Sequence, residues 1–86
     1  MPSFLVESYL AAGPALLEDA RSRARRAAEL GEGVRYLRTM FVPGDETCFH
    51  LFEAPSARVL GNAARLAALA HARIVETVDQ LEEEER

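Results

Sequence analysis

The chain has only one cysteine, Cys48, so it cannot form an internal disulfide bond. No leader is expected either, because no charged, apolar and small-residue stretch precedes the first β-rich segment. Both absences predict a cytoplasmic protein. No apolar run approaches the roughly 18 residues that a membrane-spanning helix requires, so membrane insertion is not expected.

The sequence also lacks the excess of basic charge that nucleic-acid binding requires. Its formal net charge is -4, whereas a protein that binds phosphate backbones needs a basic footprint. The one basic cluster alternates with acidic residues, which is typical of a solvated helix face. It consists of Arg21, Arg23, Arg25 and Arg26, interleaved with Glu18, Asp19 and Glu29. Nucleic acid is therefore not expected as a main partner.

What the chain does have is the composition of one ordinary globular domain. Hydrophobic residues make up 49% of its 86 residues and charged residues 28%. We predict a single domain over residues 1–81, followed by an acidic tail over residues 82–86. A domain of this size buries only about 60% of its unfolded surface, which favours an oligomer.

The order of β-rich and helical segments predicts the fold class. Strands are predicted over residues 3–10, 34–42, 47–54 and 73–79, and helices over residues 14–31 and 56–69. The two middle strands form a hairpin through the turn at Pro43 and Gly44. The resulting order βαββαβ predicts a ferredoxin-like α+β fold, with an antiparallel sheet ordered 4-1-3-2 and both helices on one face.

The other face of this sheet is left uncovered. Polarity places Phe4, Val6, Leu37, Phe41, Phe49 and Leu51 toward the helices. The apolar residues expected on the open face are Leu5, Tyr9, Tyr36, Met40, Phe52, Ile74 and Val78. So large an apolar patch is rarely exposed on a monomer. We therefore expect a homodimer that pairs the open faces into an α/β barrel.

The same assignment places the candidate metal-binding and reactive side chains on the open face. Glu7, Cys48, His50 and Glu76 form a candidate metal site, with Arg38 beside them, because histidine with carboxylate or thiolate suits nickel, zinc, copper or iron. Two alternatives stay open. These groups could instead pair with one another at the interface, or Cys48 could act as a nucleophile beside His50, although a buried inert thiol is commoner. His71 and the acidic tail are assigned no site.

Several segments of the chain resemble one family of small bacterial proteins. The matching segments are YLR, FVP, DETCF and LFEAPSA, within VRYLRTMFVPGDETCFHLFEAPS, and they lie between FLVESYL and RIVETV. The best-described member of that family is a nickel-binding protein. The resemblance implies a dimeric ferredoxin-like fold, a bound nickel or similar divalent ion, and no established enzymatic activity. The segment LAHARIVE departs from the family pattern, and no ligand is transferred residue by residue.

The main hypothesis is therefore a cytoplasmic, dimeric metal-binding protein, and whether it also catalyses a reaction stays open. A rival is a binder of a small organic ligand, or a cofactor-free monooxygenase-like enzyme, that uses the cavity between the paired sheets. That cavity would be lined by Tyr9, Tyr36, Arg38, Met40 and Phe52 and would measure about 300 Å3 or more. The fold alone does not show whether this alternative function is correct. A structural or regulatory dimer without a ligand is the third hypothesis.

Overall fold

The structure is a computed structural model that describes residues 1–11 and 13–78. Its elements follow the predicted order βαββαβ. They are β1 (Ser3–Tyr9), α1 (Pro14–Leu30), β2 (Arg35–Val42), the 3-10 turn η1 (Pro43–Asp45), β3 (Thr47–Glu53), α2 (Ala57–Leu66) and β4 (Arg73–Thr77). The predicted acidic tail over residues 82–86 lies outside the described residues.

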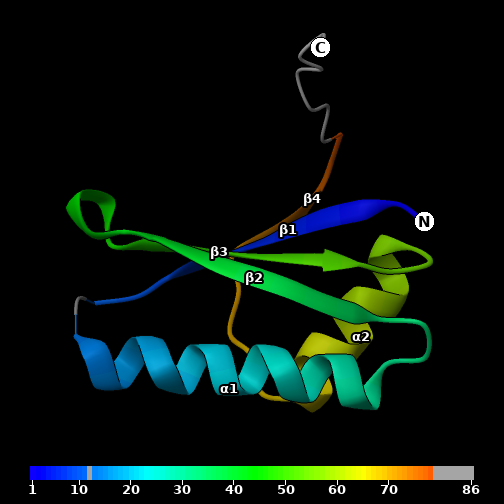
Figure 1. Ribbon diagram of the computed structural model, residues 1–86, viewed down its shortest axis with the longest axis horizontal. Helices are drawn as coiled ribbons and strands as arrows, with labels where there is room; N and C mark the ends of the chain where they lie inside the picture. The colour runs from blue at the N-terminus through cyan, green and yellow to red at the C-terminus, as the bar shows by residue number, and fades with distance from the viewer. Residues whose placement is uncertain (12, 79–86) are drawn as a thin grey trace, which may run out of the picture.

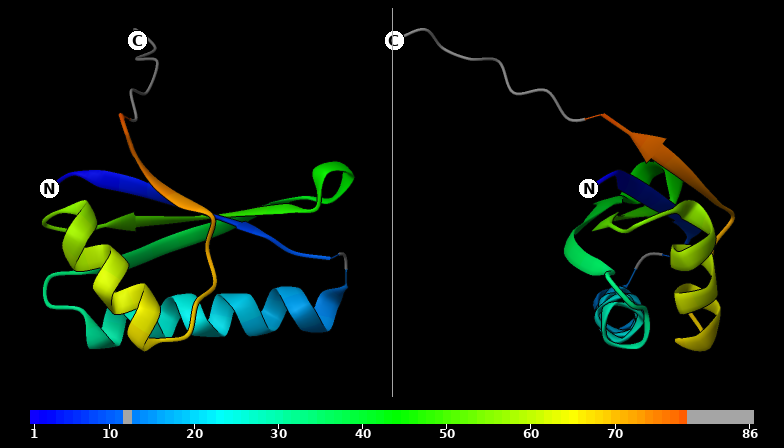
Figure 2. Two further views of the ribbon diagram at one scale, coloured as in Figure 1. Left: turned by 180° about the vertical axis from the view of Figure 1, so that it is seen from behind. Right: turned by 90° about the vertical axis from the view of Figure 1, so that its right-hand side faces the viewer.

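The four strands form one antiparallel sheet in the order β2-β3-β1-β4. This is the predicted order 4-1-3-2 read from the opposite edge, and the ferredoxin-like prediction is confirmed. Both helices lie on the same side of the sheet (Figure 1), and two further views show the same two layers from behind and from the side (Figure 2). Within residues 1–11 and 13–78, no helix has the length and apolarity needed to cross a membrane.

Helix α1 turns a stripe of alanines toward the core. Ala20, Ala24 and Ala27 are buried at spacings of four and three, which places them on one face of the helix. Their small side chains allow the helix to approach the sheet and α2 closely. At Gly31, which caps the C-terminus of α1, the packing is close as well, because an added Cβ would lie 2.6 Å from Val34 Cγ2 and 2.7 Å from Ala63 Cβ.

Helix α2 has a defined start and a defined end. Ser56 caps its N-terminus, because the Ser56 hydroxyl accepts a hydrogen bond of 3.2 Å from the Val59 N–H. The prediction extended this helix to residue 69, but it ends at Leu66. Ala68 adopts a left-handed conformation with φ 58°, and the Leu69 N–H returns to the Ala64 carbonyl at 2.9 Å. This is the Schellman arrangement, which terminates a helix.

The register of β3 differs from the prediction. On β1, Phe4 and Val6 face the helices as predicted, and they pair with Phe52 and His50. Since directly opposed residues share a face, His50 and Phe52 point toward the helices, and so does Cys48. The prediction that these three residues occupy the open face is wrong. Phe49 and Leu51, predicted inward, lie on the open face instead.

On strands β2 and β4, some of the predicted side-chain orientations are confirmed and others are wrong. On β2, Phe41 faces inward and Arg38 and Met40 face outward as predicted, as their partners on β3 show. Tyr36 pairs with Phe52 and therefore points inward, because the ladder is irregular between Tyr36 and Arg38. Leu37, predicted inward, lies within this irregularity and is 38% exposed.

On β4, Ile74 and Glu76 were predicted on the open face. They pair with Val6 and Phe4 and therefore share the helix-side face, so this prediction is wrong.

Candidate functional site

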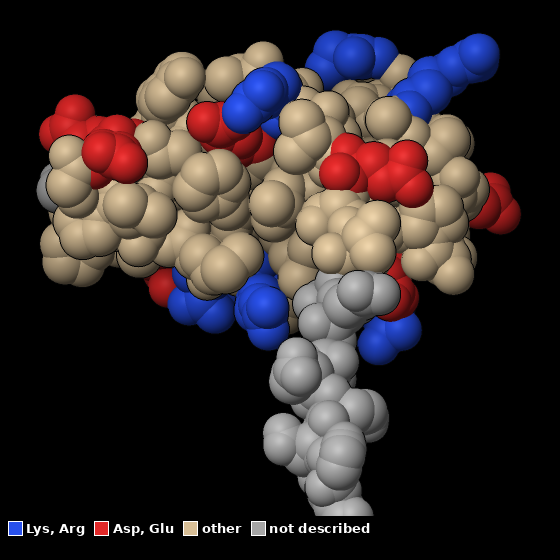
Figure 3. Space-filling view, turned by 90° about the horizontal axis from the view of Figure 1, so that it is seen from above, with Lys and Arg blue, Asp and Glu red and all other residues tan. Residues whose placement is uncertain are grey.

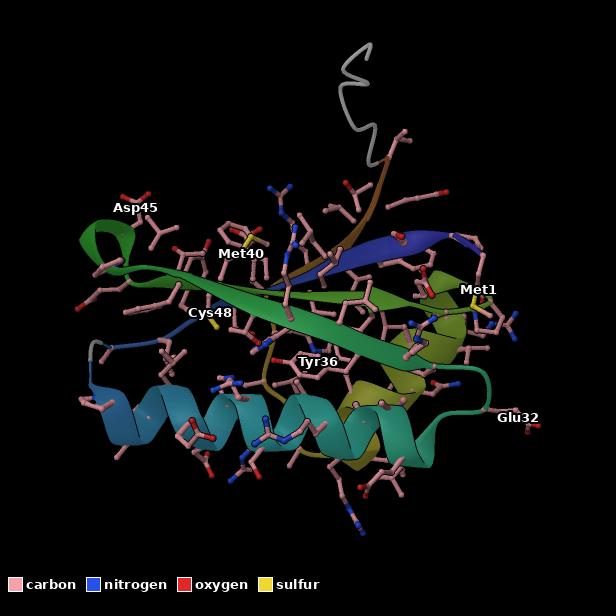
Figure 4. The ribbon with its side chains drawn as sticks, viewed as in Figure 1. Met1, Glu32, Tyr36, Met40, Asp45 and Cys48 are labelled. Atoms are coloured by element: carbon pink, nitrogen blue, oxygen red, sulfur yellow. The ribbon has the colours of Figure 1, made fainter. Side chains whose placement is uncertain are left out.

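Cys48 and His50 form a buried pair between the sheet and the helices. Both side chains are fully buried, and the Cys48 Sγ lies 3.5 Å from the His50 Nε2. The two residues are two apart on β3, so the alternation of the strand places them side by side on one face. Figure 4 shows the Cys48 side chain on the α1 side of the sheet. This is the part of the predicted metal site that the structure keeps together.

A chain of hydrogen bonds leads from this pair toward the surface. The His50 Nδ1 lies 2.7 Å from the Thr39 Oγ1, and the Thr39 hydroxyl lies 2.5 Å from the Tyr36 hydroxyl. Tyr36 packs its ring against Phe52, with the two ring centroids 5.5 Å apart. The Tyr36 hydroxyl and the Glu18 carboxylate raise the pKa of Arg21 on α1.

Burial keeps the thiol and the imidazole uncharged. It lowers the pKa of His50 from 6.5 to about 4, because a buried imidazolium loses its hydration. It raises the pKa of the Cys48 thiol for the corresponding reason, since the thiolate is the charged form. An inert thiol beside a neutral imidazole does not suit nucleophilic catalysis, which needs a thiolate.

The two carboxylates of the predicted metal site lie elsewhere. Glu7 is on the open face of β1, where its Oε1 accepts a hydrogen bond of 2.6 Å from the Arg73 Nε. Glu76 is exposed on β4, at the edge of the sheet. Among the residues that the structure describes, no three His, Cys, Asp or Glu side chains are grouped to hold a metal ion. The prediction that Glu7, Cys48, His50 and Glu76 share one face is therefore wrong.

The open face of the sheet carries apolar side chains with ion pairs among them. Its apolar members are Leu5, Met40, Phe49, Leu51 and Val75. Two ion pairs lie on it, Arg73 with Glu7 at 2.6 Å and Arg35 with Glu53 at 3.2 Å. Figure 3 views the molecule from this side, and most of the surface is uncharged, with acidic and basic side chains in small groups.

The predicted lining of a cavity between paired sheets is divided between the two faces. Arg38 and Met40 lie on the open face, and Tyr9 at the end of β1 is 72% exposed. Tyr36 and Phe52 contact each other on the helix side. In Figure 4, Tyr36 and Met40 lie on opposite sides of β2. Only three of the five predicted residues remain available to such a cavity.

Thr39 is the site residue that the sequence analysis missed. It stands opposite His50 in the β2–β3 ladder, and it supplies the partner that allows the imidazole to be buried. The available signal was a polar β-branched residue near the middle of a strand, which is ordinary in β-sheets. Recognising its role requires the register of the hairpin, and the irregularity near Leu37 alters that register.

Comparison with known proteins supports the fold. No family model and no curated protein sequence matches the chain. Among solved structures, the chain is similar to SCO4226 from Streptomyces coelicolor A3(2), with a TM-score of 0.77 and 18% sequence identity. The match covers 92% of this chain and 99% of SCO4226. At this identity the likeness establishes a shared ferredoxin-like fold over nearly the whole of both chains.

Proposed function

We propose that this chain binds a borderline transition-metal ion through the Cys48 Sγ and the His50 Nε2. The observation that carries the proposal is the distance of 3.5 Å between these two atoms. A tetrahedral ion at about 2.1 Å from nitrogen and about 2.3 Å from sulfur separates its donors by about 3.6 Å. The spacing therefore matches one edge of a tetrahedral coordination shell, with the ion in place of the shared proton.

The surroundings of His50 support the same proposal. Metal-binding histidines usually donate their second ring N–H to a fixed acceptor. With the proton on Nδ1, His50 donates to the Thr39 hydroxyl at 2.7 Å and leaves the Nε2 lone pair for the ion. The depressed pKa of His50 keeps the imidazole in its neutral, ligating form. Cys48 must lose its proton, and the charge of the ion drives that loss.

Two protein ligands leave two positions of a tetrahedron for water or another small ligand. Because Cys48 and His50 are both fully buried, the surrounding side chains must move to admit the ion with these ligands. Glu7 and Glu76 are not part of this proposal, since the structure places them away from the pair. Cysteine sulfur with imidazole nitrogen suits zinc, copper or nickel better than magnesium or calcium. A nickel ion, which the family resemblance implies, belongs to this group.

Calorimetric titration of untagged protein with Zn2+ and Ni2+ tests the proposal. We expect one ion per chain with a dissociation constant of about micromolar, and at least tenfold weaker binding in His50→Gln and Cys48→Ala. The matched control is His71→Gln, which removes the other histidine and should bind as the unmodified chain does. Equal binding by His50→Gln and the unmodified chain, or weaker binding only in His71→Gln, would place the ion elsewhere.

We also propose that the protein is a homodimer paired through the open face of the sheet, as in a dimeric α/β barrel. Leu5, Met40, Phe49, Leu51 and Val75 give this face an apolar surface with no described element covering it. The ion pairs on the face are compatible with a two-fold arrangement, because Arg73 with Glu7 and Arg35 with Glu53 are neutral as pairs and need not repel a second copy.

Sedimentation analysis of Met40→Glu tests the dimer. Met40 is 39% exposed on the open face, so a carboxylate there would be buried against the second copy at a large desolvation cost and should yield monomers. Leu66→Glu is the matched control, because Leu66 is 72% exposed on α2, away from the open face. A dimer that survives Met40→Glu but dissociates in Leu66→Glu would contradict pairing through the sheet.

A further inference from the structure

A hollow of about 390 Å3 lies between α2 and the segment that leads into β4. Figure 2 shows these two parts of the chain from behind. The polar residues that line it are Arg58, Asn62, Arg65, His71 and Arg73, and none of its lining residues is acidic. We infer that this hollow, called the α2 cleft below, binds a small phosphate-bearing anion.

Two of the three arginines of the α2 cleft, Arg58 and Arg65, differ from those on α1 in their partners. A similar hollow of about 370 Å3 on α1 is lined by Arg23, Arg25 and Arg26, and each of these is paired with a carboxylate. Helix α2 contains no Asp or Glu, and within residues 1–11 and 13–78 neither Arg58 nor Arg65 forms an ion pair. Their charge is therefore available to a ligand.

The spacing on α2 places these donors along one side of the cleft. Arg58, Asn62 and Arg65 are separated by four and three residues, so they share one helix face. The Arg65 guanidinium donates to the Asn62 Oδ1, which holds it over the cleft. Seven residues of helix separate the two arginines by about 10 Å, a span that long side chains can close around one phosphate group.

Gly61 and His71 shape the cleft further. A Cβ added to Gly61 would lie 3.7 Å from the Ile74 Cδ1 and 3.8 Å from the Arg65 Nη1, so the missing side chain leaves a recess beside Arg65. The His71 Nδ1 lies 3.1 Å from the Leu69 carbonyl oxygen, to which it can donate. That hydrogen bond leaves the Nε2 edge for a ligand. Arg73 contributes less, because its Nε is already bonded to Glu7.

The distribution of charge along the chain permits an anion to bind despite the net charge of -4. Residues 1–78 contain nine arginines and nine acidic residues, so this part is neutral. The excess negative charge belongs to residues 79–86. All ten basic residues are arginine, whose planar guanidinium bonds phosphate oxygens in pairs.

The test is an NMR titration of the full chain with inorganic phosphate and with glycerol 3-phosphate, against sodium chloride at matched ionic strength. We expect saturable amide shifts confined to residues 57–66 and 71–74, with at least fivefold weaker binding in Arg58→Gln and in Arg65→Gln. Arg25→Gln, in the α1 hollow, is the control and should change the dissociation constant less than twofold. Tighter binding of glycerol 3-phosphate identifies an organic phosphate as the ligand class, and equal binding identifies the phosphate group alone.

Shifts that sodium chloride reproduces, or shifts spread equally over α1 and α2, would overturn the proposal. So would a dissociation constant that Arg58→Gln and Arg65→Gln leave unchanged. These variants alter exposed side chains, and their amide spectra report directly whether the fold is retained.

Discussion

The His50 Nδ1 lies 2.7 Å from the Thr39 Oγ1, and this contact explains how an imidazole can be buried between a sheet and two helices. Both ring nitrogens of His50 have partners, because Nε2 faces the Cys48 sulfur. A buried polar group that keeps its hydrogen bonds loses little on leaving water. The pair of Cys48 and His50 is therefore compatible with the core even without a ligand.

Removing the Thr39 hydroxyl should show how much the buried His50 depends on its hydrogen bond with Thr39. Thr39→Val keeps the shape of the side chain but leaves the His50 Nδ1 without its partner. We expect the free energy of unfolding to fall by about 1–3 kcal/mol, the cost of an unsatisfied buried group. Thr39→Ser retains the hydroxyl and should lose less. Chemical denaturation measures both, and a Thr39→Val protein as stable as the unmodified chain would show that the hydrogen bond contributes nothing.

The stability of the metal-free protein should depend on pH through His50. Its pKa is about 4 in the folded state and 6.5 ordinarily, so the unfolded chain binds a proton that the folded chain excludes. This contribution is fully present above pH 6.5 and is lost as pH falls toward 4, to a total of roughly 3 kcal/mol.

Denaturation at several pH values in the presence of a chelator measures this loss. His50→Gln should be less pH-dependent between pH 6.5 and 4, whereas His71→Gln should retain the dependence of the unmodified chain. Parallel curves for His50→Gln and the unmodified chain would contradict a buried, neutral imidazole.

The sequence predicted the element order and the sheet order, because strands and helices carry distinct periodicities and Ser56 marks a helix start. It did not predict which face of β3 is buried. Cys48, His50 and Phe52 alternate with Phe49, Leu51 and Glu53, so both faces are largely apolar and polarity does not distinguish them. The prediction placed His50 outside as an ionisable group. The rule that ionisable side chains face solvent does not hold for a neutral histidine whose two ring nitrogens both have partners. The register of the hairpin places Thr39 opposite His50, and that register could not be read from the sequence.

Replacing Ala68 should stabilise the protein. Ala68 holds a left-handed conformation with φ 58°, which is unfavourable for a residue with a Cβ and free of that strain for glycine. Ala68→Gly should raise the free energy of unfolding by up to about 1 kcal/mol. Ser22→Gly, at an exposed position in the middle of α1, is the opposite control and should lower the free energy of unfolding by about 0.5 kcal/mol. Thermal denaturation distinguishes them, and destabilisation by Ala68→Gly would contradict the assigned helix end.

Adding a methyl group at Gly31 should loosen the contact between α1 and α2. The new Cβ would lie 2.6 Å from Val34 Cγ2 and 2.7 Å from Ala63 Cβ, so the surrounding core must move. We expect Gly31→Ala to lower the free energy of unfolding by about 1–3 kcal/mol. Gly44→Ala is the control, because nothing lies within 4 Å of its added Cβ. Equal stability of the two variants would mean that the helices are not closely packed at Gly31.

The most direct test of the metal site is the visible absorption spectrum of the protein titrated with Co2+, which substitutes for zinc and reports coordination geometry. Tetrahedral coordination by Cys48 and His50 predicts intense visible bands and a sulfur-to-cobalt charge-transfer band at one ion per chain. Both features should disappear in Cys48→Ala, and His50→Gln should weaken them, while His71→Gln leaves them unchanged. A spectrum with only the weak bands of octahedral cobalt, or one that Cys48→Ala does not alter, would contradict the account.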